Sequence, residues 1–119
     1  MIIQIMEASF RPLDANEMGL LEKLLSRDFP SRDALRLQLS SITGRTIDNN
    51  GSLELKPEQG GRAEMLRGCP TEGTCPDIDG GPIAILLHVR NSQLHLLEIF
   101  KEDGSEIKRA PKAEALVVY

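Results

Sequence analysis

Four residues of the chain have side chains that commonly bind zinc: Cys69, Cys75, His88 and His95. Their spacing is C-x5-C-x12-H-x6-H, and two thiolates with two imidazoles could supply the tetrahedral ligand set that zinc prefers. Zinc-binding cysteines are usually closer in sequence, however, and both histidines lie in segments that we expect to be strands. The spacing therefore favours loop thiols and surface histidines over a metal site.

His88 and His95 form a second candidate as a pair. They flank the turn-forming dipeptide Asn91-Ser92, and a two-residue turn there would place the two imidazoles directly opposite each other on neighbouring strands. Two facing imidazoles disfavour simultaneous protonation, so the pair could respond to protons or supply two ligands of a binding site. Two polar residues near a solvated turn would give the same pattern.

Glu98 is the third candidate, because the same register places it on a hairpin face whose other residues are apolar. A carboxyl group buried there would tend to keep its proton, which is how proteins make general acids. An ion pair with an arginine such as Arg45 or Arg62 would look the same in sequence. The candidate binding residues, with Arg90 beside the turn, are therefore His88, His95, Glu98 and Arg90.

The sequence gives no catalytic set. No histidine, serine and acid occur in an arrangement that suggests a triad, and there is no glycine-rich phosphate-binding loop. Residues 48–51 (DNNG) and 77–80 (DIDG) resemble the start of calcium loops, but neither continues into the full pattern with its closing glutamate. We therefore assign no catalytic residue and no cofactor, and an enzyme is the less favoured interpretation.

These candidates lie in or beside the most apolar stretch of the chain, residues 82–101. Two apolar runs, residues 83–90 and 93–101, flank the Asn91-Ser92 turn and predict a central β-hairpin. One hairpin face should meet the core. The other becomes polar toward the turn, so we expect it to be half covered at most.

Two helices are expected before the hairpin. Asp14, with Glu17 three residues later, predicts a capped helix over about residues 14–26. Pro30 should end that helix, and Ser31 is expected to cap a second one whose apolar stripe extends to Ile42. Helices first and strands afterwards indicate an α+β fold rather than alternating βαβ units.

Short alternating runs predict the remaining strands, at residues 1–6, 45–48, 52–56, 62–67 and 116–118. Residues 68–81 are rich in Gly, Pro, Asp and Thr, so we expect a long surface loop that could act as a lid over a site. The expected architecture is one domain, residues 1–119. A two-helix N-terminal layer packs on a mostly antiparallel sheet of about five to seven strands.

Composition disfavours several classes of function. The net charge is −4 and no basic stripe interleaved with aromatic residues is present, which disfavours nucleic-acid binding. Aromatic residues make up 3% of the chain, so an aromatic-lined pocket is not expected. No stretch approaches the roughly 20 apolar residues that span a bilayer, and no secretory signal is recognisable. We expect a cytoplasmic protein that does not contact membranes and whose cysteines are thiols.

Several motifs resemble those of a family of small uncharacterised bacterial domains. They are FRPL at residues 10–13, DNNGSLEL at 48–55, PTEG at 70–73, PIAILLHV at 82–89 and LEIFKEDGS at 97–105. The resemblance spans about residues 10–119 and leaves residues 1–9 outside the shared part. It implies a bacterial, cytoplasmic, single-domain protein and supplies no activity, cofactor or catalytic residue.

Two hypotheses for function follow. The first is a non-enzymatic interaction or regulatory module that binds either a second copy of itself or another protein, which it could neutralise. It fits the missing catalytic set and the half-covered sheet face. The second is a small-molecule- or metal-binding protein or enzyme that uses His88, His95 and Glu98. We favour the first, because a catalytic set is usually visible as a group of residues.

Overall fold

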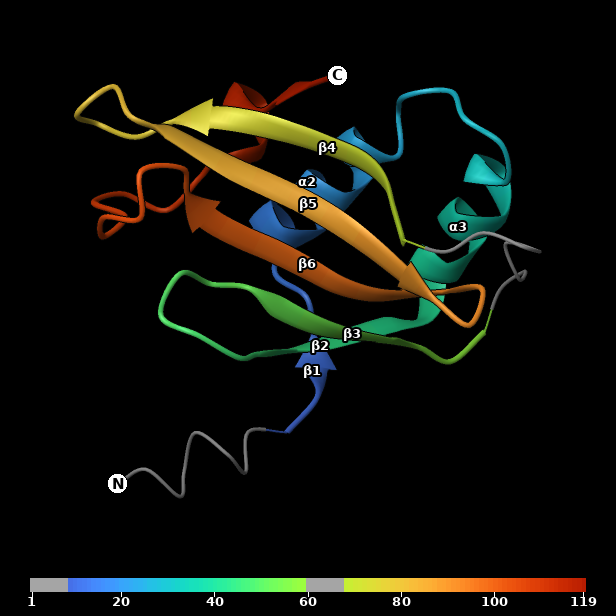
Figure 1. Cartoon of the computed structure of the whole chain (residues 1–119). Helices are drawn as coiled ribbons and strands as arrows, with labels where there is room; N and C mark the ends of the chain where they lie inside the picture. Colours follow the sequence, from blue (N-terminus) through green and yellow to red (C-terminus); the bar gives the residue numbers. More distant parts are fainter. Residues whose placement is uncertain (1–8, 60–67) are drawn as a thin grey trace.

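The computed structural model describes residues 9–59 and 68–119, so the strands expected at residues 1–6 and 62–67 lie outside the described residues. Within these ranges a seven-stranded antiparallel sheet is accompanied by two α-helices (Figure 1), which confirms the α+β fold. The strand order is β1-β2-β3-β6-β5-β4-β7. The strands are β1 (Arg11–Pro12), β2 (Ile42–Thr46), β3 (Leu53–Pro57), β4 (Gly68–Pro76), β5 (Pro82–Arg90), β6 (Gln93–Lys101) and β7 (Val117–Val118). The helices are α2 (Ala15–Leu24) and α3 (Arg32–Gln38), with short 3-10 helices η1 (Leu39–Ser41) and η2 (Ala113–Ala115).

Helix α2 begins at the predicted capping box. The backbone N–H of Glu17 donates to Asp14 Oδ1 at 2.7 Å, and the backbone N–H of Asp14 donates to Glu17 Oε1 at 2.9 Å. Arg11 of β1 donates to both carboxylate oxygens of Glu17, at 2.8 and 2.9 Å. That charge-assisted hydrogen bond holds the pKa of Glu17 below its ordinary value. The start of α2 is therefore fastened to the first strand.

Helix α3 differs from the prediction at both ends. Ser31 adopts a left-handed conformation with φ of 68°, and its side chain makes no capping hydrogen bond. The helix ends at Gln38, and Ile42 begins β2 instead of continuing the helical stripe. Ile42 pairs with Pro57 of β3 and is buried, so a β-branched residue expected on a helix fills the core from a strand.

Both helices cover the same face of the sheet. Leu21 and Leu24 of α2 and Leu35 of α3 are fully buried, and they belong to one core cluster with the inward side chains of the hairpin, among them Leu87 and Leu97. Figure 1 shows α2 behind β4, β5 and β6, and α3 near the turn of the hairpin. Among the described residues no helix covers the opposite side of the sheet, which we call the outer face.

The central hairpin is confirmed, but the predicted register is wrong beyond its first two pairs. Val89 pairs with Leu94 as expected, whereas His88 pairs with Leu96, so His95 is an extra residue in β6 and forms a β-bulge. A one-residue shift exchanges the two faces of a strand. Leu97 and Ile99 therefore point into the core, while Leu96, Glu98 and Phe100 move to the outer face.

Residues 68–76, expected to be part of a loop, form strand β4. This segment pairs with β5 from Thr71 opposite Leu87 to Pro76 opposite Pro82, with an irregularity between Gly68 and Thr71. The hydroxyl of Thr71 donates to the carbonyl of Leu24 at 2.9 Å and so ties the strand to α2. Pairing with a long apolar strand outweighs the low strand propensity of Gly and Pro here. The predicted lid is therefore a strand of the sheet.

A buried ion-pair cluster holds the other end of the hairpin. Lys101 Nζ lies 3.0 Å from Asp77 Oδ2 and 2.6 Å from Asp79 Oδ2, and Asp77 also accepts the backbone N–H groups of Lys108 and Arg109. Burial disfavours the charged form of Asp77. The N–H groups and the Lys101 ammonium outweigh this effect and hold the pKa of Asp77 well below its ordinary value. The cluster fastens the segment after β6 to the sheet.

Candidate functional site

The structure brings His88 together with Glu98, not with His95. Because the bulge turns Glu98 outward, its Oε1 lies 2.8 Å from His88 Nε2 on the outer face, where both side chains are partly exposed. Arg45, one of the two cations expected beside Glu98, instead pairs with Glu54 at 2.7 Å. The other, Arg62, lies outside the described residues. Glu98 is thus not the buried acid that the expected register implied.

The carboxylate of Glu98 can orient the His88 imidazole for proton transfer, but neither cysteine is a suitable nucleophile beside it. Burial and the nearby carboxylate of Glu72 raise the pKa of the Cys69 thiol, which keeps it in the unreactive protonated form. Cys75 is buried in the core on the helix side of the sheet.

In residues 9–59 and 68–119, no three His, Cys, Asp or Glu side chains are grouped closely enough to hold a metal ion. The zinc-like spacing therefore does not correspond to a cluster.

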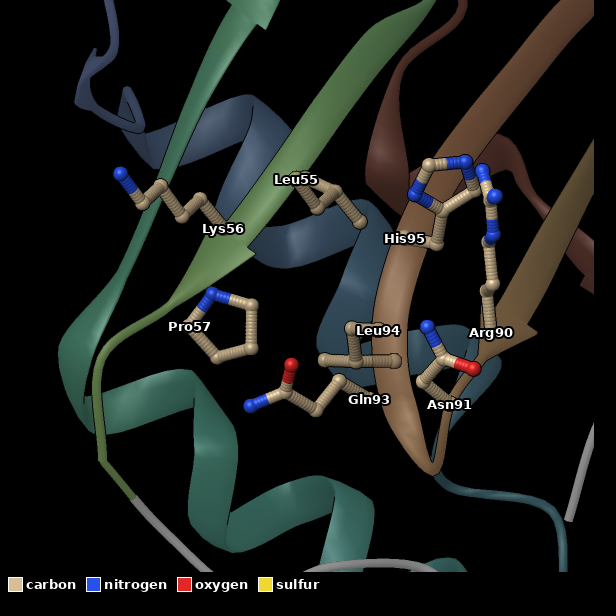
Figure 2. Close-up of a pocket in the computed structure, with 8 residues that line it drawn as sticks. All are labelled: Leu55, Lys56, Pro57, Arg90, Asn91, Gln93, Leu94 and His95. Atoms are coloured by element: carbon tan, nitrogen blue, oxygen red, sulfur yellow. The ribbon is translucent and has the colours of Figure 1, made fainter.

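His95 and Arg90 lie instead at a pocket of about 300 Å³ between β3 and β6 (Figure 2). Its lining comes from the ends of the two strands and from the hairpin turn. The lining residues are Leu55, Lys56, Pro57, Arg90, Asn91, Gln93, Leu94 and His95. Leu55 and Leu94 are buried core residues, so the pocket reaches from the surface to the edge of the core.

The pocket exists because β3 and β6 separate at the bulge. They pair at two positions, Leu53 with Leu97 and Glu54 with Leu96. Past these, Gln38 of α3 takes the place of a strand partner: the backbone N–H of Leu94 donates to Gln38 Oε1 at 2.9 Å, and Gln38 Nε2 donates to the carbonyl of Ser92 at 3.1 Å. Gln38 is only 1% exposed, so this arrangement is part of the fold rather than a surface contact.

The ionisable side chains in the described part of the lining are all basic: Lys56, Arg90 and His95. Lys56 Nζ lies 5.4 Å from the centroid of the Phe10 ring, and Figure 2 shows this side chain pointing away from the hairpin. The side chains of Arg90 and His95 lie next to each other and extend in one direction beside the pocket. Within the part of the chain that the structure describes, neither forms a hydrogen bond or an ion pair. They are therefore available to a ligand.

The sequence indicated Arg90 and His95 but not the residues that shape the pocket around them. Leu55 was expected only as a strand residue, and Gln38 was not considered. A signal for Gln38 was present: it follows Leu35 by three residues and so lies on the side of the helix that packs against the sheet. A polar residue in that position must find buried hydrogen-bond partners.

Comparison with known proteins places the chain in a family without assigning it a function. A family model described as a domain of unknown function, DUF6984, matches residues 10–111. The match begins at Phe10, where the motif resemblance also begins, and ends before the last strand. Comparisons with curated proteins and with solved structures gave no match. No helix in the described ranges is long and apolar enough to cross a membrane. Because the model matches most of its length, the chain belongs to the DUF6984 family of domains of unknown function.

Proposed function

We propose that the protein is a non-enzymatic interaction module, and that its outer sheet face binds a second copy of the chain. One observation carries this proposal: both helices cover one face of the sheet, while the other face presents partly exposed apolar side chains from its central strands. In the middle of this face are Leu86 on β5 and Leu96 and Phe100 on β6. An antiparallel sheet can face water on one side, but apolar residues at its centre favour a partner.

The surroundings of this apolar centre resemble the rim of an interface. The hydrogen-bonded pair His88–Glu98, on β5 and β6, and the ion pair Arg45–Glu54, on β2 and β3, lie on either side of Leu96. Stable interfaces combine a desolvated apolar centre with a polar, solvent-accessible rim. These paired side chains stay partly exposed, so covering the apolar centre would not bury a polar group without a partner.

Charge distribution and shape favour a second copy of the chain as the partner. Lys56 lies on the β2–β3 side of the outer face, where Arg45 and Glu54 offset each other, whereas Glu72 lies on β4 at the opposite side. A two-fold axis near Leu96 would bring the basic side of one copy toward the acidic side of the other. The molecule measures 38 × 36 × 23 Å, and its broad side can accommodate the roughly 800 Å² per partner of a standard interface.

The proposal places this module in the cytoplasm of a bacterium. Cys69 and Cys75 are free cysteines, as expected in a reducing compartment. The bacterial source is supported by the motif resemblance alone. A regulatory role would follow if formation of the dimer competes with binding of another protein to the same face.

Sedimentation equilibrium between about 1 and 500 µM tests the homodimer, because that range covers weak as well as moderate affinities. We expect a dimer that Leu96→Glu converts to a folded monomer, since a carboxylate would be buried at the centre of the interface. Glu72→Arg, a change at an exposed position, should weaken the dimer without affecting folding. Leu37→Glu is the matched control, because Leu37 is 62% exposed on α3, away from the outer face.

A wild-type chain that is monomeric over the whole range refutes the homodimer. A dimer that survives both Leu96→Glu and Glu72→Arg shows that a different surface is used. Circular dichroism of each variant separates loss of the interface from loss of the fold, because an unfolded variant loses the strand signal and a folded monomer retains it.

A further inference from the structure

We infer that the pocket between β3 and β6 binds a small organic anion, a molecule with a carboxylate or phosphate group on an apolar body. This inference does not depend on the proposed dimer. It assigns a ligand class to a site from its shape, lining and charge.

The volume and the apolar lining of the pocket determine the size and the apolar character of the ligand's uncharged part. A volume of about 300 Å³ is at the lower end of the range for small-molecule sites, so the ligand is small. Leu55 and Leu94 form an apolar floor, and Leu94 is 1% exposed. The ring of Pro57 adds a further apolar surface. Such a floor favours an aromatic ring or a short aliphatic chain over a bare ion.

The polar side of the pocket sets the charge of the ligand. The Arg90 guanidinium can donate two parallel hydrogen bonds to a carboxylate or phosphate, and the His95 ring can donate a third. Among the described residues of the lining none is acidic, although the whole chain carries a net charge of −4. Because the overall charge repels anions, a locally basic lining is the feature that would select one.

The fold preforms this pocket. Gln38 holds the backbone of Ser92 and Leu94 from the helix side, and Pro57 lacks the N–H group that would extend the ladder of β3 toward β6. The bulge at His95 ends the regular pairing on the other side. A ligand therefore does not have to separate paired strands, which keeps the free-energy cost of binding low.

Other groups of charged residues give less support for a ligand site. Lys101 is paired with both Asp77 and Asp79, and Asp77 also accepts a neighbouring backbone N–H group, so these residues serve the fold. His88 and Glu98 are already hydrogen-bonded to each other. Arg90 and His95 instead line a cavity, and their side chains have no partner among the described residues.

Chemical-shift titration of the ¹⁵N-labelled protein tests the inference, with four probes: benzoate, phenyl phosphate, inorganic phosphate and benzyl alcohol. We expect saturable shifts of the backbone N–H signals of Leu55, Leu94 and His95 with benzoate, phenyl phosphate or both. Whichever of the two binds more tightly identifies the anionic group. Benzyl alcohol and inorganic phosphate should each bind at least about tenfold more weakly, because each lacks one half of the recognised chemistry.

Two variants complete the experiment. Arg90→Gln should weaken binding of the better probe by about tenfold or more, because it removes the charged fork. Arg36→Gln, at an exposed position on α3, removes the same charge away from the pocket and should leave binding unchanged. The inference is overturned if benzoate and phenyl phosphate both give no localised shifts at about 20 mM. It is equally overturned if the two variants bind alike, or if benzyl alcohol or inorganic phosphate binds as well as the better probe.

Discussion

Ser52 joins the two halves of the sheet, and its replacement by alanine gives a measurable test of how they are held together. Next to Ser52, β3 and β6 pair through Leu53 and Leu97. One residue further on, the Ser52 side chain replaces a backbone partner from β3. The backbone N–H of Ile99 donates to Ser52 Oγ at 2.9 Å, and the hydroxyl donates to the carbonyl of Ile99 at 3.2 Å. Ser52 is 1% exposed, so water does not compete for these bonds.

Ser52→Ala removes a single oxygen atom and leaves the backbone N–H of Ile99 buried without an acceptor. An unsatisfied buried donor costs about 1–3 kcal/mol, whereas the loss at the carbonyl is smaller, because a carbonyl tolerates one missing donor better. We expect a total loss of about 2 kcal/mol in the free energy of unfolding. For a domain of this size that corresponds to a fall in Tm of roughly 6–12 °C.

Urea unfolding followed by far-UV circular dichroism is the suitable assay, because the chain has no tryptophan to report by fluorescence. The midpoint should fall while the slope m stays unchanged, since the surface exposed on unfolding is the same. Ser40→Ala is the matched control: its exposed hydroxyl donates to the carbonyl of Leu37, and its loss should cost less than about 0.5 kcal/mol. A change equally small for Ser52→Ala would refute the argument that this side chain substitutes for a strand partner.

Two further changes test other parts of the sheet. Gly73→Ala should destabilise the protein by about 1–3 kcal/mol in a urea titration, because its Cβ would lie 2.5 Å from the carbonyl oxygen of Val117 and would push β7 away from β4; an unchanged midpoint would contradict this. The pKa of Asp77 is lowered from 3.8, so the stability it provides is complete above that pH and is lost as the pH falls further. Tm should therefore fall between about pH 4 and pH 2, and less steeply in Asp77→Asn; equal slopes would count against the Lys101 cluster.

The features that could be predicted from the sequence depend on neighbouring residues. The capping box of Asp14 and Glu17 satisfies backbone groups within one helical turn, so its residue types reveal it. The hairpin of β5 and β6 likewise follows from two apolar runs and the turn at Asn91 and Ser92, both of which adopt positive φ. Arg90 and His95, which the sequence offers as candidate binding residues, lie near the turn of that hairpin and line a pocket.

The features that were missed depend on partners far away in the sequence. Strand β4 has few strand-forming residues, and its pairing with β5 and the bond from Thr71 to α2 make it a strand. Gln38 lies 54 residues from Ser92, so no local pattern connects them. Lys101 was expected only to end the hairpin, yet it is buried because Asp77 and Asp79 neutralise it.

The bulge at His95 explains both the candidate site and the core. Without it, Leu96, Glu98 and Phe100 would point into the core, and a carboxylate would have to be buried among aliphatic side chains. With it, the inward residues of β6 are Leu94, Leu97, Ile99 and Lys101. The step from 94 to 97 is odd, although alternation in a strand requires even steps, and such a step is what one inserted residue produces. The same inserted residue that keeps Glu98 out of the core also ends the pairing of β3 with β6. The pocket is therefore a consequence of the bulge that allows β6 to pack.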